Sequence, residues 1–250
     1  REQENFHSFS EKARDIRDNR FNDKPELVKD FDEFRKVVRA KIAQRKLYDL
    51  QLLSAYHMAF AQNACNFAVQ GAGKTSIVYA AYAYLKSLPE NDSRHVDRLL
   101  VIGPLSSFAP WIKEYRECFG EQPRVQRLSG DSKVLRTDKE QHLYSTNPAE
   151  LTLIYHGGVD LLNQEILSFL KRNKTMVVVD EAHRIKNPEG VWGKSIVEIG
   201  KEARARVILT GTPVPNGYED LFNLFQYLYP YGFKEILGFH YGNLVDMTKN

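Results

Sequence analysis

From about residue 47 onward, short β-rich apolar runs alternate with stretches of helical character, and this alternation restricts the fold more than any other feature of the chain. The apolar runs are Asn66–Val69, Leu99–Ile102, Arg124–Leu128, Leu151–Tyr155, Met176–Val179 and Val207–Leu209. The helical stretches between them include Ser76–Leu88, Ser107–Phe119, Val159–Leu170 and Val191–Ile199. Strands joined by crossover helices form a parallel sheet with helices on both faces. The sequence therefore predicts one α/β domain over residues 47–250, whose ligands bind beyond the carboxyl ends of the strands.

Residues 1–46 are predicted to form a helical N-terminal arm ahead of this domain. Two groups of apolar residues recur at helical spacing, namely Phe6, Phe9, Ala13 and Ile16, and then Leu27, Phe31, Phe34, Val38 and Ile42. Segment 22–25, with sequence NDKP, has turn chemistry and a proline suited to the start of a helix. Charged residues fill the other faces, so we expect a largely solvated arm that packs on another part of the protein.

The bulk composition places few limits on function. A hydrophobic fraction of 42% in 250 residues is enough for one large core. The net charge is only +3, so any contact with nucleic acid has to come from a local patch. The two cysteines, Cys65 and Cys118, lack metal-ligand spacing, which indicates an intracellular protein (bacterial cytoplasm or nucleus) without a structural metal. We find no apolar run that could span a membrane, and the chain reads as a piece of a longer protein.

A glycine-containing loop between a predicted strand and a predicted helix carries the first chemical signal. Segment 68–76 reads AVQGAGKTS. Glycines at 71 and 73 allow the backbone amides to turn toward a phosphate chain, and the following helix adds its positive N-terminal end. Lys74 then reaches the β- and γ-phosphates of a nucleotide, and the Thr75 hydroxyl binds Mg²⁺. The alternative is a glycine turn with an incidental lysine. The predicted nucleotide-binding residues of this loop are Gly71, Ala72, Gly73, Lys74, Thr75 and Ser76.

Two adjacent carboxylates follow the most apolar of the predicted strands, Met176–Val179. In a parallel sheet with a phosphate loop, Asp180 is placed to hold the magnesium shell and Glu181 to polarise the attacking water. A solvated acidic strand end is the alternative. His183 either couples two halves of the site or only forms a hydrogen bond near the end of the strand. The sequence thus predicts a catalytic set of Lys74, Asp180 and Glu181.

The residues around these carboxylates resemble a known family. Segment 180–187, DEAHRIKN, looks like motif II of the Swi/Snf-type ATPases within the superfamily-two (DEAH-box) helicases. Segment 209–216, LTGTPVPN, closely resembles motif III, and it is followed by EDL at 219–221 and LYP at 228–230. Segment 103–106, GPLS, with Trp111 and Glu114 behind it, is similar to motif Ia.

The resemblance covers residues from about 47 to 235, with its motifs in the family's order. Segment 47–51, LYDLQ, resembles the adenine-recognising segment, with Gln51 as the residue that reads the base. The approach to the phosphate loop, AVQ at 68–70, departs from the acidic, methionine-containing approach usual in the family, and segment 153–156 matches motif Ic only loosely. The resemblance implies the N-terminal RecA-like lobe of a helicase-like ATPase that uses ATP and Mg²⁺.

Further roles follow from the resemblance and from the predicted topology. Thr210, Gly211 and Thr212 end a strand next to the carboxylate strand, so with His183 they could relay the state of the γ-phosphate. The DNA groove is predicted to be lined by Pro104, Ser106, Ser107 and Tyr155. Contacts of this kind to phosphates are independent of base sequence and sensitive to salt. Ordinary loops of a parallel sheet are the alternative, and Lys113 and Arg116 could form a solvated face.

Superfamily-two motors close two lobes around one ATP, and the resemblance implies that arginine fingers come from a second RecA-like lobe in the same protein. Nothing after Pro230 resembles such a lobe, so we expect residues 1–250 to bind ATP and to hydrolyse it poorly. The resemblance implies a translocase on duplex DNA that remodels protein–DNA complexes. A nucleotide-gated interaction module without translocation, or the motor subunit of a restriction or phage-defence system, stays open.

Overall fold

The computed structural model describes residues 2–17, 24–69, 71–128, 136–184, 191–214, 217–218, 220–238 and 240–249. Several residues of the predicted motifs lie outside this set: Asn22, Asp23, Gln70, 185–187, Pro215, Asn216 and Glu219. The side chain of Ile16 also lies outside it.

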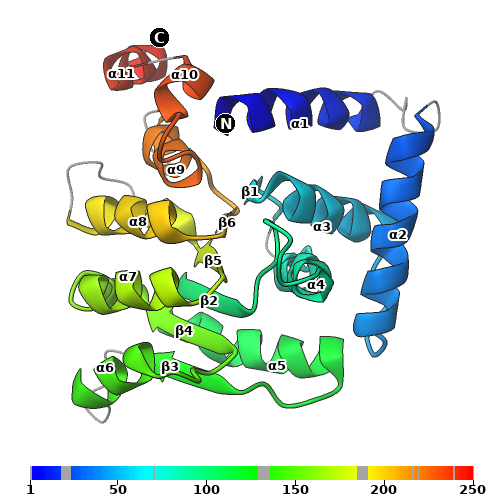
Figure 1. Cartoon of the computed structure of the whole chain (residues 1–250). Helices are drawn as coiled ribbons and strands as arrows, with labels where there is room; N and C mark the ends of the chain where they lie inside the picture. Colours follow the sequence, from blue (N-terminus) through cyan, green and yellow to red (C-terminus); the bar gives the residue numbers. More distant parts are fainter. Residues whose placement is uncertain are drawn as a thin grey trace.

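Strands and helices alternate along the described part of the chain (Figure 1). The strands are β1 (Asn63–Asn66), β2 (Arg98–Gly103), β3 (Val125–Leu128), β4 (Leu151–Tyr155), β5 (Thr175–Asp180) and β6 (Ala205–Leu209). The helices are α1 (Glu2–Arg17), α2 (Pro25–Lys41), α3 (Asp49–Ala61), α4 (Lys74–Ser87), α5 (Phe108–Phe119), α6 (Arg136–Tyr144), α7 (Asn163–Arg172), α8 (Val191–Glu202), α9 (Asp220–Leu228), α10 (Phe233–Leu237) and α11 (Tyr241–Lys249).

The described strands form one sheet in the order β1-β6-β5-β2-β4-β3, and every neighbouring pair is parallel. Figure 1 shows α3, α4 and α5 on one face of this sheet and α7 and α8 on the other. Parallel strands need crossover connections, and helices on both faces supply them. The predicted fold class, a parallel α/β sheet preceded by a helical arm, is confirmed.

The side chains of the central strands point alternately into two hydrophobic cores. Leu99 and Val101 of β2 join the core under α2, α3, α4 and α5, whereas Leu100 and Ile102 join the core under α6, α7, α8 and α9. The side chains of the central strand β5 alternate between the same two cores, and residues Met176–Val179 are fully buried. A strand buried on both faces reads as a continuous apolar run, which explains why this one was the clearest in the sequence.

The strand ahead of the phosphate loop was predicted three residues too late. It is β1, which pairs with β6 from Asn63 to Asn66, and the predicted run Asn66–Val69 is mostly loop. The Asn66 side chain accepts a hydrogen bond from the backbone N–H of Ala68 at 3.0 Å, a local bond that competes with strand pairing. The apolar side chains that suggested a strand, Phe67 and Val69, are 40% and 73% exposed.

Two helices also begin later than predicted. Helix α5 begins at Phe108 after a 3₁₀ turn at Leu105–Ser107, and α7 begins at Asn163 after a 3₁₀ turn at His156–Gly158 and a further turn. Helix α6 was not predicted, and its mostly polar sequence carries little helical periodicity. Such turns at helix starts are common and are not visible in apolar periodicity.

The N-terminal arm is two helices, and its second helix contributes to the core of the domain. Phe34, Val38 and Ile42 are almost completely buried in the cluster that also contains residues of α3, α4 and the sheet. The Phe34 ring contacts the rings of Tyr56 in α3 and Tyr84 in α4, with centroids 5.6 and 5.1 Å apart. The arm that we expected to be mostly solvated therefore covers the outer side of α3 and α4 (Figure 1).

Replacing Phe34 by alanine should reveal this contribution. We expect Phe34→Ala to lower the free energy of unfolding by about 3–5 kcal/mol, because the ring leaves a cavity among other aromatic rings. Urea denaturation followed by circular dichroism measures the loss. Leu161→Ala is the control, since Leu161 is 69% exposed, and it should change stability by less than about 0.5 kcal/mol. Equal losses in the two variants would show that α2 does not share the core.

Candidate functional site

The predicted site residues follow strands that end at one edge of the sheet. In the register of β5 and β6, Asp180 lies opposite Leu209, and Thr210 follows directly. In the register of β2 and β4, Gly103 lies opposite Tyr155. Ligands of parallel sheets bind at this carboxyl edge. The topology therefore brings the phosphate loop, the carboxylate pair and the predicted DNA-facing segments to the same edge.

The phosphate loop needs its two glycines for backbone conformation. Gly71 and Gly73 have φ angles of +85° and +78°, in the left-handed region that other residues avoid. Gly73 directly precedes α4, so the loop leads into the N-terminal end of that helix. The Lys74 ammonium donates a hydrogen bond to the Ala68 carbonyl oxygen at 2.8 Å, which places the cation across the loop. Ser76 is buried, and its hydroxyl bonds the Glu114 carboxylate.

Gln51 connects the start of α3 to the phosphate loop. Its amide oxygen accepts the Tyr48 backbone N–H at 3.1 Å, and its amide nitrogen donates to the Ala72 carbonyl oxygen at 3.1 Å. A Cβ atom on Gly73 would lie 2.4 Å from that nitrogen, so the glycine also leaves room for Gln51. A hollow of about 520 Å³ lies beside this segment, between the end of α2 and the start of α3. The segment predicted to read the base and the predicted phosphate loop are thus in direct contact.

Asp180 is held by donors on both oxygens of its carboxylate. The Trp111 indole N–H donates to Oδ2 at 3.0 Å, and the Glu181 backbone N–H donates to Oδ1 at 3.0 Å. The Nε2 of buried His156 lies 2.8 Å from the Asp180 carbonyl oxygen, to which it can only donate. These bonds fix the direction of a carboxylate at the end of a fully buried strand.

Glu181 and His183 connect the carboxylate strand to the neighbouring strand. Glu181 has a φ angle of +52°, a left-handed conformation that is uncommon outside glycine and occurs at functional sites. Its carboxylate lies 3.1 Å from Nδ1 of His183, which is also 3.3 Å from the Thr210 hydroxyl. The same hydroxyl oxygen accepts the Thr212 backbone N–H at 3.1 Å. His183 thus contacts one side chain from each of the two predicted motifs.

The segment after β6 also contacts the segment after β1. The Thr210 backbone N–H donates to the Asn66 carbonyl oxygen at 3.2 Å. A Cβ atom on Gly211 would lie 3.9 Å from the carbonyl oxygen of Ala68, the atom that accepts the Lys74 hydrogen bond. The residues that follow β6 therefore lie beside Ala68, whose carbonyl oxygen accepts the Lys74 hydrogen bond.

The residues predicted to face DNA lie together, but they differ in exposure. Pro104 is buried, Ser106 is exposed, and Ser107 and Tyr155 are half-buried. The Ser107 hydroxyl donates to the Pro104 carbonyl oxygen at 2.9 Å, so it stabilises the turn. Ser106 is therefore the hydroxyl of this loop that is exposed to solvent. Among the two cations of α5, Lys113 is 78% exposed and pairs with Glu117 at 3.6 Å, as expected of a solvated face.

The side chains present suit a magnesium–nucleotide site. Mg²⁺ takes oxygen ligands and commonly binds through one or two carboxylates together with phosphate oxygens. Asp180 supplies a carboxylate, and no hydrogen bond to another described residue occupies the Thr75 hydroxyl. Within the residues that the structure covers there is no group of three or more His, Cys, Asp or Glu side chains able to hold a metal. Burial raises the pKa of the Cys65 and Cys118 thiols to about 12, so they remain protonated at neutral pH.

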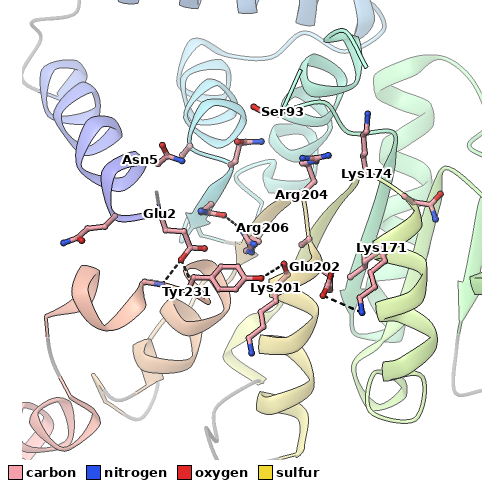
Figure 2. A pocket seen from close by; sticks show the side chains of 18 of the residues that line it. Glu2, Asn5, Ser93, Lys171, Lys174, Lys201, Glu202, Arg204, Arg206 and Tyr231 are labelled. Atoms are coloured by element: carbon pink, nitrogen blue, oxygen red, sulfur yellow. Dashed lines mark hydrogen bonds and ion pairs between the residues drawn. The ribbon is translucent and has the colours of Figure 1, made fainter. Parts of the chain in front are cut away.

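A cavity of about 990 Å³ lies at the opposite edge of the sheet, where β5 and β6 begin (Figure 2). Two of its cations bond protein groups: Lys174 donates to the Glu90 carbonyl oxygen, and Arg206 donates to Asn63 Oδ1 at 2.9 Å and to the Gly200 carbonyl oxygen. Helices α7 and α8 end here, and basic side chains stabilise helix C-termini. Volume alone therefore does not identify the nucleotide site.

Sequence reasoning missed three residues that position this site. Trp111 and Glu114 were noticed only as part of a motif, and His156 only as part of a weak match. Each contacts a predicted site residue: Trp111 the Asp180 carboxylate, Glu114 the Ser76 hydroxyl and His156 the Asp180 carbonyl. The sequence signal was a polar or aromatic side chain a few residues after a predicted strand. Such a signal does not identify the residue that the side chain contacts.

Alanine at the two loop glycines should separate backbone strain from steric conflict. Both substitutions force a left-handed alanine, at about 1–2 kcal/mol each. A Cβ atom on Gly71 would meet nothing within 4 Å, whereas one on Gly73 would meet Gln51. We therefore expect Gly73→Ala to lower the free energy of unfolding more than Gly71→Ala in urea titrations. Adding Gln51→Ala should rescue Gly73→Ala and not Gly71→Ala, and the absence of that rescue would refute the steric explanation.

Comparisons with known proteins agree with this geometry. The ATP-dependent helicase FUN30 of Saccharomyces cerevisiae is 30% identical over 164 residues, which cover 64% of this chain and 13% of that protein. The RAD54-like DNA repair and recombination protein of Drosophila ananassae is 27% identical over 180 residues, 70% of this chain and 22% of that protein. The chain thus spans less than a quarter of the length of these relatives.

A solved structure has the same fold. The Sulfolobus solfataricus SWI2/SNF2 ATPase core, solved in complex with dsDNA, superposes with a TM-score of 0.58 and 22% identity, over 82% of this chain and 43% of that one. None of the helices that the structure describes is long and apolar enough to cross a membrane. Residues 67–249 match the family described as the SNF2-related domain, so the chain belongs to that family.

Proposed function

We propose that this chain is the nucleotide-binding lobe of an ATP-dependent motor that acts on duplex DNA. The observation that carries the proposal is the series of contacts at the carboxyl edge of the sheet. It runs from Asp180 through Glu181 and His183 to Thr210, at distances of 3.0, 3.1 and 3.3 Å. Hydrolysis of a triphosphate requires a metal-binding carboxylate, a group that orients water and a sensor of the γ-phosphate. The series offers all three from neighbouring strands.

In this proposal the phosphate loop and the first turn of α4 bind the triphosphate. Lys74 exchanges the Ala68 carbonyl oxygen for β- and γ-phosphate oxygens, and Gln51 and the hollow beside α3 receive the base. Thr75 and Asp180 would hold Mg²⁺, which when bound neutralises the charge that develops on the phosphates. Glu181 orients the attacking water, and His183 keeps its carboxylate in place while contacting Thr210.

Duplex DNA is the proposed track of the motor. Support comes from the relatives, which are named as helicases and as a repair and recombination protein, and from the similar core that was solved with dsDNA. The loop after β2 and the end of β4 lie side by side at the carboxyl edge, where they can meet successive phosphates. Arginine fingers come from a second RecA-like lobe of the same protein, and closure of the two lobes couples hydrolysis to movement along DNA or to remodelling of protein–DNA complexes.

Replacing Glu181 by glutamine tests the catalytic assignment. In a protein that joins this lobe to its second lobe, we expect turnover to fall about a hundredfold or more, because the amide cannot act as a base. Affinity for a fluorescent ATP analogue in Mg²⁺ should stay within about twofold, since the side chain keeps its shape. Steady-state ATPase assays with and without duplex DNA, and analogue titrations, measure the two quantities.

Glu202→Gln is the matched control, because Glu202 lies at the opposite edge of the sheet and should leave both quantities unchanged. Unaltered turnover in Glu181→Gln would remove Glu181 from its role. The 250 residues alone should bind the analogue and turn over ATP slowly, since an arginine finger contributes about a thousandfold or more in rate. Rapid DNA-stimulated turnover by this chain alone would contradict the assignment of the fingers to a second lobe.

A negative charge at Ser106 should weaken DNA binding. Ser106→Asp places a carboxylate on the exposed part of the loop after β2, where it would repel phosphates. We expect the affinity of Ser106→Asp for random-sequence duplexes to be severalfold lower than that of the wild-type chain. The affinity of both proteins should decrease as the salt concentration rises. Fluorescence anisotropy measures it. Asn91→Asp makes the same change in net charge in an exposed turn before β2, at the other edge of the sheet, and should have little effect. Equal losses would argue against the DNA-facing loop.

A further inference from the structure

We propose that Trp111 is a positioning residue for the magnesium site, acting through its hydrogen bond to Asp180. The inference rests on the proposed function, in which Asp180 holds Mg²⁺. Trp111 is 1% exposed, yet its indole N–H reaches the Asp180 Oδ2 at a distance of 3.0 Å. A buried indole N–H requires an acceptor, and this one uses a carboxylate that stands 69 residues later in the sequence.

The bond completes the orientation of the Asp180 side chain. Its other oxygen, Oδ1, already accepts the Glu181 backbone N–H. With one donor on each oxygen, rotation of the carboxylate would break one or both bonds, so the remaining lone pairs keep a fixed direction. Partners of this kind orient metal-binding carboxylates, and their loss typically costs about 10–100-fold in metal affinity or activity.

Trp111 is itself held rigidly against the helix that follows the phosphate loop. The Tyr79 hydroxyl of α4 donates to the Trp111 carbonyl oxygen at 2.7 Å, and the two rings meet edge to face with centroids 5.4 Å apart. One turn later in α5, Glu114 bonds the Ser76 hydroxyl and pairs with Arg45 at 3.0 Å. The indole is therefore fixed relative to Thr75, the second proposed magnesium ligand, which lies in the first turn of α4.

The magnesium dependence of nucleotide binding tests this role in Trp111→Phe. Phenylalanine keeps an aromatic ring in the core but cannot donate to Asp180. We expect the Mg²⁺ concentration that half-saturates binding of a fluorescent ATP analogue to rise about tenfold or more. Binding of the analogue in excess EDTA should not change, because the phosphate loop and Gln51 are untouched. Tyr82→Phe is the matched control, since it removes the hydroxyl of another buried α4 tyrosine, which bonds Asp97 and Glu150 and neither Trp111 nor Asp180, and its half-saturation should stay within twofold.

Equal magnesium dependence in Trp111→Phe and the wild-type chain would overturn the inference, and so would an equal rise in Tyr82→Phe, which would indicate a general packing effect. If the wild-type chain shows no magnesium-dependent nucleotide binding at all, the proposed function fails first, and the inference falls with it. The two failures are therefore distinguishable.

A spectroscopic measurement on a chain that keeps Trp111 covers the case in which Trp111→Phe does not fold. The chain has two tryptophans, so Trp192→Phe leaves a single indole N–H signal for nuclear magnetic resonance. Adding Mg²⁺ with ADP should move this signal upfield, because a metal on the Asp180 carboxylate withdraws charge from the acceptor of the indole hydrogen bond. ADP added with EDTA and without Mg²⁺ should leave the indole signal in place. A signal unmoved by Mg²⁺ and ADP would overturn the inference.

Discussion

The parallel pairing of β5 with its two neighbours is the constraint on which the rest of the site depends. Its register places Asp180 level with Leu209 of β6 on one side, and Val179 level with Ile102 of β2 on the other. Because side chains alternate along a strand, a shift of one residue would turn the carboxylate into one of the two apolar cores. The fully buried strand ahead of Asp180 makes such a shift very costly. The same apolar packing that stabilises the sheet therefore fixes the position of a charged group at its edge.

At that edge, chemistry depends on a few polar bonds and on unfavourable backbone geometry. Glu181 adopts a left-handed conformation, which costs free energy for a residue with a side chain. Two contacts accompany this conformation. The Glu181 backbone N–H donates to the Asp180 carboxylate, and the Glu181 side chain contacts His183. Two carboxylates that are adjacent in sequence thus point to different partners. One is tied toward α5 and the other toward β6, which lets each take a separate role around one phosphate group.

The sequence was sufficient to predict the parallel sheet and to place the glycine loop and the carboxylate pair at its carboxyl edge, because each depends on local patterns. A buried strand reads as an apolar run, and a positive φ angle reads as glycine at 71 and 73. The position of the edge strand β1 was not predicted correctly from its local pattern. Its sequence, NACN, contains two asparagines and gains its strand conformation from pairing with β6, whereas the more apolar residues after it belong to the loop. Contacts between distant residues, such as Trp111 with Asp180, were also out of reach, because spacing along the chain does not reveal which buried donor meets which acceptor.

Helix α5 connects the loop that is predicted to meet DNA with the carboxylate that is proposed to bind Mg²⁺. The loop expected to meet DNA runs from Gly103 to Ser107, and a Cβ atom on Gly103 would lie 3.3 Å from the Asp180 Cβ. Ser107 directly precedes the helix, and Trp111 follows one turn later with its bond to the same aspartate. Tight packing leaves the loop little room to move independently of the helix. The loop predicted to meet DNA and the carboxylate proposed to bind Mg²⁺ therefore pack against each other and are both joined to this helix.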